Sequence, residues 1–347
     1  MVKVGIIGMG RISAVHIDGL KNVKDAKITA ICDIDGEKLN AAGDRLGIPE
    51  EYRFKDYKEL IACPEVQAVE ICTPNYLHVP MALDAVKAGK PVNIEKPLGI
   101  ACNEQMTELL AEIEESGIAN MMCFSYRFRH AVRYAKHLID SGRLGKIVNV
   151  NIEYLQSGVF IPGRRLEWRF VKEYAGSGTL ADLGVHLIDM TRFLLGDFSS
   201  ICAMSSTVVD KRMKLDSDEY APVEVDDITS FVAKLKNGAI ANFLVTKCAI
   251  GESNTIIYEV FGTEGVIKFN LNNPEELTFC TAKSDMTANS ETVKVPREYF
   301  LEQEKCFIDA VNGKINPYYP SVAEGASCQT IVDAALKSAT EHIIVNF

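Results

Sequence analysis

The first third of the chain alternates short apolar runs with amphipathic segments. The apolar runs predict strands at Val2–Gly8, Ala26–Asp33, Val66–Cys72, Val92–Glu95 and Ala119–Phe124. The amphipathic segments predict helices at Arg11–Leu20, Glu37–Leu46, Val79–Ala88 and Asn103–Ser116. This alternation is typical of a parallel, doubly wound α/β sheet of the Rossmann type. Right-handed crossovers then bring the carboxyl ends of all these strands to one rim, where open α/β sheets bind their ligands.

After about residue 125 the pattern changes to hairpins. Asn237-Gly238 separates two alternating runs, Ile228–Leu235 and Ala239–Lys247, and Gly262–Gly265 separates a second pair. Tight hairpins mean antiparallel pairing, so we expect a C-terminal α/β domain with an open, mainly antiparallel sheet. Further helices are predicted at Ala131–Ser141, Thr179–Leu195 and Val322–Ile344.

The length of 347 residues also favours two domains. We place a dinucleotide-binding domain at 1–124 and a substrate-binding and oligomerisation domain at 125–347. The closing helix, at about 322–344, is a candidate to pack back on the first domain.

Composition narrows the function classes. The net charge of −10 argues against nucleic-acid and anionic-membrane partners, because the field has the wrong sign. The ten cysteines form no C-x-x-C pair and lie mostly in apolar segments, which predicts buried free thiols and no metal site. Neither a signal peptide nor an apolar run of membrane-spanning length is present, so a cytoplasmic location is expected.

A glycine fingerprint follows the first strand. Gly8 suits the tight turn, and Gly10 suits close approach of a pyrophosphate to the helix N-terminus, although Ser13 replaces the third glycine. Asp33 ends the second strand, where an acid can accept both ribose hydroxyls and would repel a 2′-phosphate. A plain tight turn is the alternative for the glycines, and a solvated turn residue for Asp33. With both in register, the pattern favours NAD over NADP.

Two more strand ends carry polar residues. Thr73 and Asn75 suit hydrogen bonds to a nicotinamide ribose or phosphate, though Thr-Pro-Asn is equally consistent with a simple turn. His78 begins a helix, where capping or packing competes with a functional role. Glu95 is suited either to a ribose hydroxyl or to pairing with Lys96. Pro97 restricts Lys96 to extended geometry, which fixes that lysine at the strand end.

The segment Gly176–Asp189 leads from glycines into a largely apolar helix. Asp182 and His186 stand at i and i+4 and so share one face. Helix capping by Asp182 and a satisfied interior histidine would be the structural alternative. His186 titrates naturally near neutral pH and can accept a hydroxyl proton, so we favour a catalytic interpretation.

Further residues are candidates for lining a cleft. They are Tyr126 and Arg127 after the last strand of the first domain, Trp168 and Arg169 in a charged loop, and Tyr154. Each arginine could instead snorkel over ordinary packing. Arg164 and Arg165 suit an acidic or phosphorylated sugar, or equally a solvated loop.

In combination these motifs resemble the glucose–fructose oxidoreductase/inositol dehydrogenase family (Gfo/Idh/MocA). The resemblance rests on Gly8-x-Gly10, Glu95-Lys96-Pro97, Tyr126-Arg127-Phe128 and Gly-Ser-Gly-Thr-Leu-x-Asp182-x-Gly-x-His186, and it spans nearly the whole chain. It implies catalytic roles for Lys96, Asp182 and His186, and often a cis peptide at Lys96-Pro97. It also implies a homodimer or homotetramer packed through the C-terminal sheet.

The sequence therefore predicts three sets of site residues, and no metal. The catalytic set is Lys96, Asp182 and His186. The cofactor-binding set is Gly8, Gly10, Arg11, Ile12, Asp33, Thr73, Asn75, His78, Glu95, Lys96, Arg127, Trp168 and Arg169. The substrate-binding set is Lys96, Tyr126, Arg127, Tyr154, Asp182 and His186.

We expect an NAD-dependent oxidoreductase that interconverts a secondary alcohol and a ketone on a sugar, a sugar derivative or a cyclitol. His186 would be the general base and Lys96 would polarise the reacting oxygen. One alternative is a redox-neutral enzyme with tightly bound NAD that acts on glycosides by transient oxidation. The other is a non-catalytic NAD-binding sensor, which need not keep proton-transfer groups.

Overall fold

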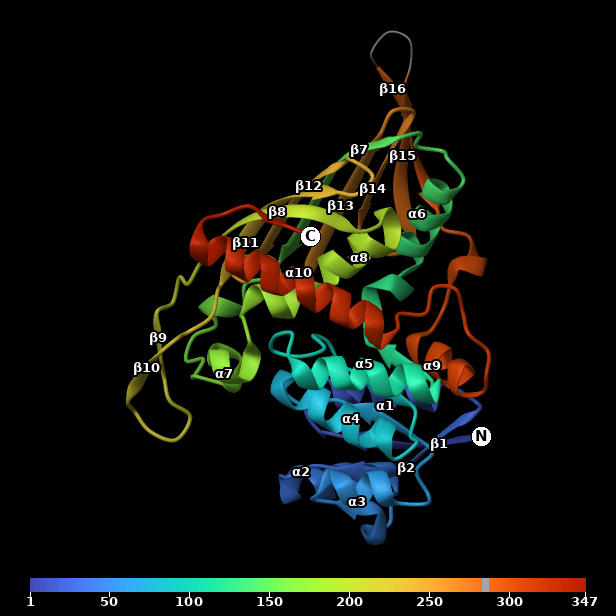
Figure 1. Ribbon diagram of the computed structural model, residues 1–347, viewed down its shortest axis with the longest axis vertical. Coiled ribbons are helices and arrows are strands. Elements are labelled where there is room, and N and C mark those ends of the chain that lie inside the picture. Colours follow the sequence, from blue (N-terminus) through green and yellow to red (C-terminus); the bar gives the residue numbers. More distant parts are fainter. Residues whose placement is uncertain (283–286) are drawn as a thin grey trace. The chain divides into compact units, whose positions relative to one another are not determined.

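The computed structural model describes residues 1–282 and 287–347, which form two compact units (Figure 1). The first unit consists of Met1–Phe124 and Leu301–Gln329. The second consists of Ser125–Phe300 and Thr330–Phe347. The first unit thus includes a segment near the C-terminus that the sequence interpretation had placed in the second domain.

The first unit is built on a six-stranded parallel sheet, as predicted, with the order β3-β2-β1-β4-β5-β6. Its strands are β1 Val2–Ile7, β2 Ala26–Cys32, β3 Arg53–Phe54, β4 Ala68–Ile71, β5 Val92–Ile94 and β6 Asn120–Met122. Every residue of β4 and β5 is buried, which is typical of parallel strands covered by helices on both faces.

Helices flank this sheet. They are α1 Ser13–Lys21, α2 Gly36–Leu46, α3 Tyr57–Ala62, α4 His78–Lys87, α5 Glu104–Ser116 and α9 Gln303–Val311. Helix α4 packs against α3 and α5, and helix α1 packs against α9. The six-residue α3 is too short for a clear helical period, and neither it nor α9 was predicted.

The segment after α9 also contacts the first sheet. Asn120 Oδ1 accepts a hydrogen bond from the backbone of Val322 (2.9 Å), and the Met122 N–H donates to Pro320 O (2.8 Å). Helix α10 (Val322–Glu341) starts here, so its first residues belong to the first unit and the rest to the second. It ends at Glu341, three residues earlier than predicted, and β17 follows.

The hydrogen-bond register aligns the carboxyl ends of five of these strands. Ile7 pairs with Cys32 and with Ile71, and Ile94 pairs with Ile71 and with Met122. The loops that follow therefore leave the sheet from one rim. Predicted cofactor-binding residues lie on four of them: Gly8, Asp33, Thr73 and Glu95.

The second unit contains a nine-stranded sheet in the order β16-β15-β14-β13-β7-β12-β11-β8-β17. Among the described strands of this sheet only β7 and β12 pair in parallel, so the sheet is mainly antiparallel, as predicted. Both predicted hairpins are confirmed, as β11–β12 and β13–β14. The strands are β7 Ile147–Leu155, β8 Phe198–Ser206, β11 Ile228–Leu235, β12 Ile240–Thr246, β13 Thr255–Gly262, β14 Gly265–Asn270, β15 Glu276–Ala282, β16 Ala288–Lys294 and β17 Val345–Asn346.

Helices cover one face of this sheet. Because side chains along each strand point alternately to the two faces, every second side chain lies on the other, open face. In Figure 1, α6 (His130–Asp140) and α8 (Val185–Leu195) lie against one side. In β11 the inward Phe231 and Ala233 are buried, whereas Val232 between them is 47% exposed. We call the other side the open face, and its residues include Asn149, Asn151, Cys202, Met204, Val232, Ile240 and Asn242.

Smaller elements complete the second unit. They are α7 Lys172–Ala175 and a separate hairpin of β9 Lys211–Met213 and β10 Tyr220–Pro222.

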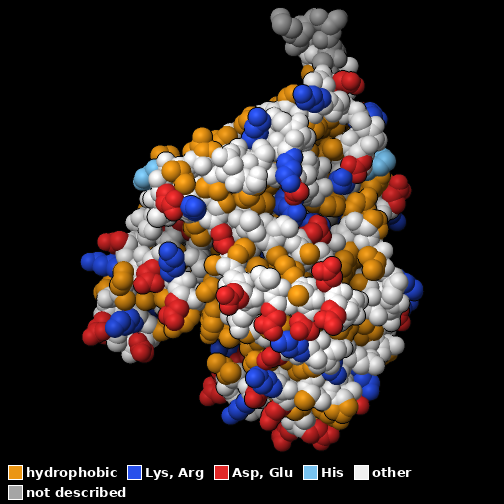
Figure 2. Space-filling model, in the orientation of Figure 1, with side chains coloured by type: hydrophobic (Ala, Val, Ile, Leu, Met, Phe, Trp, Pro, Cys, Tyr) orange, Lys and Arg blue, Asp and Glu red, His pale blue; other side chains and the backbone are white. Residues whose placement is uncertain are grey.

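All ten cysteines are free thiols, and six of them are buried, in line with the prediction. Acidic side chains stand along α5, including Glu104, Glu108 and Glu115, and red atoms are frequent over the first unit in Figure 2. Such a surface repels polyanions. Within residues 1–282 and 287–347, no helix combines the length and the apolar character needed to cross a membrane.

We expect Glu304→Gln to change the pH dependence of stability. Burial, followed by the nearby charge of Glu70, raises the pKa of Glu304 to about 6 from an ordinary 4.5. A raised pKa contributes stability that is full below pH 4.5 and is lost as pH rises through about 6. The glutamine variant should therefore match the native protein at pH 4.5 and exceed it at pH 8 by about 2 kcal/mol. Urea unfolding across this pH range tests this, and parallel pH curves would contradict it.

Candidate functional site

The two glycines of the fingerprint are required for different reasons. Gly8 has φ +93°, and a Cβ there would lie 2.7 Å from the carbonyl oxygen of Cys72. At Gly10, by contrast, a Cβ would meet no described atom within 4 Å. Packing therefore explains Gly8, whereas the open space over Gly10 is what a phosphate needs for close approach to the backbone.

The start of α1 is prepared for an anion. Asp35, Asp56 and Asn103 cap the N-termini of α2, α3 and α5, but no side chain among the described residues caps α1. Its first N–H groups and its positive dipole end therefore remain available beside the exposed Arg11 and Ile12. Ser13, at the third glycine position, is 2% exposed and donates its hydroxyl to Gly10 O (2.7 Å).

Asp33 is fixed against the glycine loop. Its Oδ2 accepts the Met9 N–H (2.7 Å), and its Oδ1 accepts the Asp35 N–H (2.8 Å). Each carboxylate oxygen keeps a second lone pair, so the side chain is oriented and can still accept two hydroxyl protons. The open Gly10, the uncapped helix and the fixed carboxylate together fit the pyrophosphate and adenosine ribose of a dinucleotide.

The loop after β4 is held from behind by His78. Its Nδ1 lies 2.7 Å from Pro97 O and its Nε2 lies 2.8 Å from Thr73 O, and the side chain is 1% exposed. Burial lowers the pKa of His78. The structure thus gives His78 a bracing position between two loops. Asn75 is buried at the start of a short 3₁₀ turn, and Thr73 Oγ1 is buried with no partner among the described residues.

Glu95 and Lys96 follow β5, and the Lys96–Pro97 peptide is cis, as the resemblance implied. Glu95 Oε1 lies 3.0 Å from His16 Nε2, and Glu95 Oε2 accepts the backbone N–H of Lys96 (3.1 Å). Burial raises the pKa of Glu95, but His16 and Lys96 outweigh burial, so that this pKa is lowered. Both oxygens therefore have protein partners, which fix the orientation of this carboxylate. Sequence reasoning missed His16, although it lies on the inner face of α1.

In the second unit, the predicted Asp182/His186 helix begins as a π-helix over Leu180–Gly184 and continues as α8. Asp226 orders its entry by accepting hydrogen bonds from the N–H groups of Gly178 (2.8 Å) and Leu180 (2.9 Å). A Cβ at Gly178 would overlap the Asp226 carbonyl oxygen, which explains a glycine there. Single π turns of this kind are frequent at functional sites.

Asp182 pairs with a lysine that the sequence interpretation missed. Its Oδ2 lies 2.8 Å from Lys247 Nζ, and the two side chains are 34% and 11% exposed. Lys247 follows β12, and its spacing from Asp182 gives no signal in the sequence. Asp182 thus balances the positive charge of Lys247, which is largely buried and would be costly without a partner.

His186 lies among the predicted tyrosines. Its ring is edge-on to Tyr126 (centroids 4.7 Å apart, 80° between planes) and 6.4 Å from the ring of Tyr154. The Tyr126 and Tyr154 hydroxyls are 2.7 Å apart, and Asn254 donates to the first (3.0 Å) and accepts from the second (2.7 Å). Burial, with the charge of Asp182 as a further contribution, raises the pKa of Tyr154. Four predicted residues of this unit therefore gather with Lys247 and Asn254.

Other predicted residues have different surroundings. Arg127 is 2% exposed and holds both oxygens of the buried Asp189 at 2.6–2.9 Å in an internal ion pair. Arg169 stacks on Trp168, with 4.3 Å from its guanidinium to the ring centroid.

Two further arginines, Arg164 and Arg165, are bound within their own region. Arg164 donates to the carbonyl of Gly158 (2.9 Å), and Arg165 to those of Lys214 (2.6 Å) and Ser217 (2.9 Å). These contacts favour an architectural loop over recognition of an acidic sugar.

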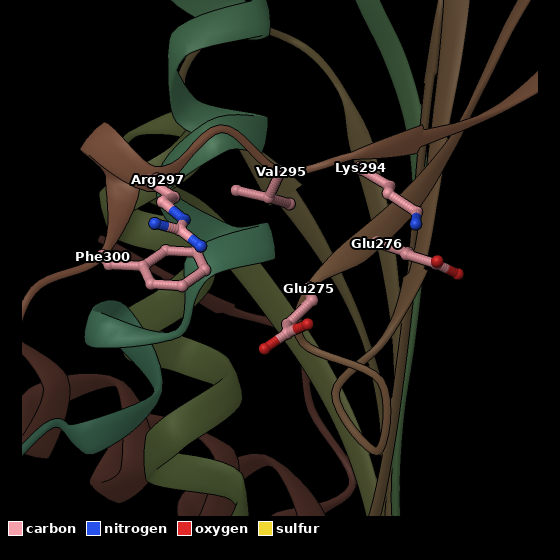
Figure 3. Close-up of a pocket in the computed structure, with 6 residues that line it drawn as sticks. All are labelled: Glu275, Glu276, Lys294, Val295, Arg297 and Phe300. Atoms are coloured by element: carbon pink, nitrogen blue, oxygen red, sulfur yellow. The ribbon is translucent and has the colours of Figure 1, made fainter.

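A separate cavity of about 280 Å³ lies near β15 and β16 in the second unit (Figure 3). Its lining is Glu275, Glu276, Lys294, Val295, Arg297 and Phe300. In Figure 3 the Arg297 side chain lies beside the Phe300 ring. None of the predicted site residues lines this cavity, so it is not a candidate for their chemistry.

Comparison with known proteins assigns both parts of the chain. Residues 2–123 match the profile described as oxidoreductase family, NAD-binding Rossmann fold, and residues 132–268 match the GFO/IDH/MocA C-terminal domain. The solved structure of levoglucosan dehydrogenase in complex with NADH is similar, with a TM-score of 0.91 and 30% identity over 99% of this chain and 98% of that one.

Two curated relatives are also similar. Levoglucosan dehydrogenase from Pseudarthrobacter phenanthrenivorans is 35% identical over 71% of this chain and 66% of that protein. Myo-inositol 2-dehydrogenase from Thermotoga maritima is 26% identical over 98% of this chain and 97% of that protein. Both profiles and the glycine rim agree, and the chain belongs to the Gfo/Idh/MocA family of NAD-binding oxidoreductases.

Proposed function

We propose that this protein is an NAD-dependent dehydrogenase that interconverts a secondary alcohol and a ketone on a sugar, a sugar derivative or a cyclitol. The observation that carries the proposal is the cluster in the second unit, where His186 lies against two hydrogen-bonded tyrosines and Asp182 pairs with Lys247. Proton-transfer groups held in this way are expected in a catalyst, whereas a non-catalytic sensor does not need them. The named relatives, which act on levoglucosan and inositols, support the substrate class.

Each residue has a proposed role. His186 accepts the hydroxyl proton as general base, and the Lys96 amine donates a hydrogen bond to the reacting oxygen and stabilises its developing charge. Asp182 orients the substrate or the imidazole, and Lys247 keeps that carboxylate ionised and fixed. A nicotinamide held at the rim of the first unit would accept the hydride from the same carbon.

Asp33 supports NAD over NADP. Its carboxylate is anchored by the Met9 and Asp35 N–H groups, so it cannot turn away from a 2′-phosphate without losing both hydrogen bonds. Two anionic groups forced together at this rim would repel each other.

We also propose that the open face of the second unit is the surface through which copies of the chain assemble. Met204 (75%), Val232 (47%) and Ile240 (40%) are exposed there, and exposed apolar sheet surface favours association. A cytoplasmic location remains our prediction from the sequence.

The first experiment is a screen of inositols, aldoses, anhydrosugars, amino sugars and glycosides with NAD at alkaline pH, followed by NADH absorbance. We expect stoichiometric NADH with at least one polyol. Because each removes a group acting on the reacting oxygen, Lys96→Met and His186→Ala should each lower kcat by about 10²–10⁴-fold. The exposed His137 on α6 provides a matched control, His137→Gln.

The outcomes separate the alternatives. Unchanged turnover in either variant would remove the role assigned to that residue. Turnover of a glycoside with no net NADH, and with NAD retained through gel filtration, would favour the redox-neutral function.

A second test concerns cofactor choice. The native protein should have a kcat/KM for NAD at least 100-fold above that for NADP. Asp33→Asn keeps a hydrogen-bond acceptor but removes the charge that repels a 2′-phosphate, so the preference should fall at least tenfold. Steady-state kinetics with both cofactors measure this ratio. A native protein that uses both equally would contradict the assignment of Asp33.

A third test concerns the Asp182–Lys247 pair. Lys247→Met leaves the carboxylate without its 2.8 Å partner, and kcat/KM should fall about 10–100-fold, corresponding to about 1.4–2.8 kcal/mol. Lys247→Arg should retain more activity because it keeps the charge. In a double-mutant cycle with Asp182→Asn, the two losses should be far from additive. Additive losses would show that the two side chains act independently.

A further inference from the structure

The core of the first unit contains a buried chain of polar side chains. His16 comes from α1, Glu70 from β4 and Asn93 from β5, and Glu95 follows β5. Their exposures are 1%, 0%, 0% and 8%. Ionisable groups under a parallel sheet are costly unless they are paired. Their presence in the centre of the sheet therefore calls for a reason.

The geometry sets the protonation of the ring. His16 Nδ1 lies 2.7 Å from Glu70 Oε2, and His16 Nε2 lies 3.0 Å from Glu95 Oε1. Glu70 Oε2 also accepts a hydrogen bond from Asn93 Nδ2 (2.8 Å). A neutral imidazole donates from one nitrogen only, whereas an imidazolium satisfies both carboxylates.

The other titratable groups around the His16 ring are consistent with a positively charged imidazolium. Cys72 and Cys123 also lie beside His16, but burial raises the pKa of each thiol, so both stay neutral. Burial by itself lowers the pKa of His16. The two carboxylates that face its ring, with Glu70 Oε2 at 2.7 Å and Glu95 Oε1 at 3.0 Å, oppose that effect, because nearby negative charge favours the imidazolium. Glu304 of α9, whose pKa is raised to about 6, is the remaining acid near Glu70.

A bound metal ion explains the arrangement of these residues less well than a hydrogen-bonded network does. His16, Glu70 and Cys123 offer ligand atoms within 4.8 Å of one another. Ligands of a tetrahedral zinc ion, however, stand about 3.3 Å apart, given bonds of about 2.0–2.1 Å. The 2.7 Å approach of His16 Nδ1 to Glu70 Oε2 is that of a hydrogen bond.

This series of hydrogen-bonded side chains ends at the backbone of Lys96. Glu95 uses Oε1 for His16 and Oε2 for the Lys96 N–H (3.1 Å), so the ring and the backbone hold its carboxylate from both sides. His16 is also only three residues after Ser13, which bonds Gly10 at the start of α1. The same helix therefore connects the glycine loop with the strand end that carries Lys96.

We propose that His16 is a positioning residue for hydride transfer: a permanently charged imidazolium that holds the Glu95 carboxylate against the Lys96 backbone and so fixes the segment carrying the Lys96 amine. This inference rests on the role proposed above for Lys96. Its physical basis is that a small displacement of a polarising group costs much of its effect.

The first test is the protonation state of the ring. Long-range ¹⁵N–¹H NMR of ¹⁵N-histidine-labelled protein separates an imidazolium from either neutral tautomer, and His16→Gln identifies the signal. If that variant does not fold, single replacements of the other five histidines identify it by elimination. We expect imidazolium shifts that stay constant from pH 6.5 to 9. One protonated ring nitrogen would place the second proton on the glutamate that faces the other nitrogen, and would overturn the proposal.

Glu95→Gln provides a second spectroscopic outcome. It removes one of the two anions while its amide oxygen can still accept from Lys96, so the His16 signal should begin to titrate between pH 6.5 and 9. An unchanged signal would overturn the proposed charge coupling. Elemental analysis of the protein as purified completes this arm, because one equivalent of zinc that is lost in His16→Gln would replace the proton network by a metal site.

The kinetic test uses His16→Gln with His137→Gln as its matched control. We expect kcat to fall at least tenfold in the first variant, with KM for NAD within threefold and unfolding still cooperative. The control should match the native protein. A parallel loss of NAD affinity and cooperativity would reduce His16 to a general structural role. If the NMR result stands but Lys96→Met turns over normally, the role proposed for Lys96 fails and the charge network remains.

Discussion

The hydrogen-bond register of the parallel sheet in the first unit determines where the cofactor-side chemistry can stand. Because Ile7, Cys32, Ile71 and Ile94 end at one level, four loops leave from a single rim. A shift of one residue in any pair would send each side chain of that strand to the opposite face of the sheet. The open Gly10, the anchored Asp33 and the backbone of Lys96 all depend on that alignment. The loops need little structure of their own, because the sheet fixes their starting points.

The second unit holds its polar groups differently. Its tyrosine, histidine and carboxylate side chains come from a 3₁₀ turn, a strand of the mainly antiparallel sheet, a π turn and a helix. Asp226 anchors the entry to that turn, and the Arg127–Asp189 ion pair is buried beneath. Residues that look exposed and reactive in the sequence can thus be structural, and Arg127 is an example. Charge is kept in pairs in both units, and so Lys247 and His16 each lie opposite a carboxylate.

Much of the fold could be predicted from local patterns. Strand and helix alternation gave the parallel sheet, and Asn237-Gly238 gave a hairpin because that dipeptide favours the turn itself. The glycine fingerprint and Asp33 were found because their spacing is fixed by the cofactor. Lys247 and His16 were missed since their partners, Asp182 and Glu95, are 65 and 79 residues away in the chain. No periodicity reports such a contact.

The return of Leu301–Gln329 to the first unit has a consequence for how the protein is made. Helix α9 packs on α1, and Glu304 reaches the neighbourhood of Glu70, across more than two hundred residues of chain. During synthesis the nucleotide-binding half therefore emerges long before its last pieces, and it must wait for Ser125–Phe300 of the second unit to be translated. Closing contacts of this sequence separation are slow to form. Completion of the first half is thus tied to the successful synthesis of the second.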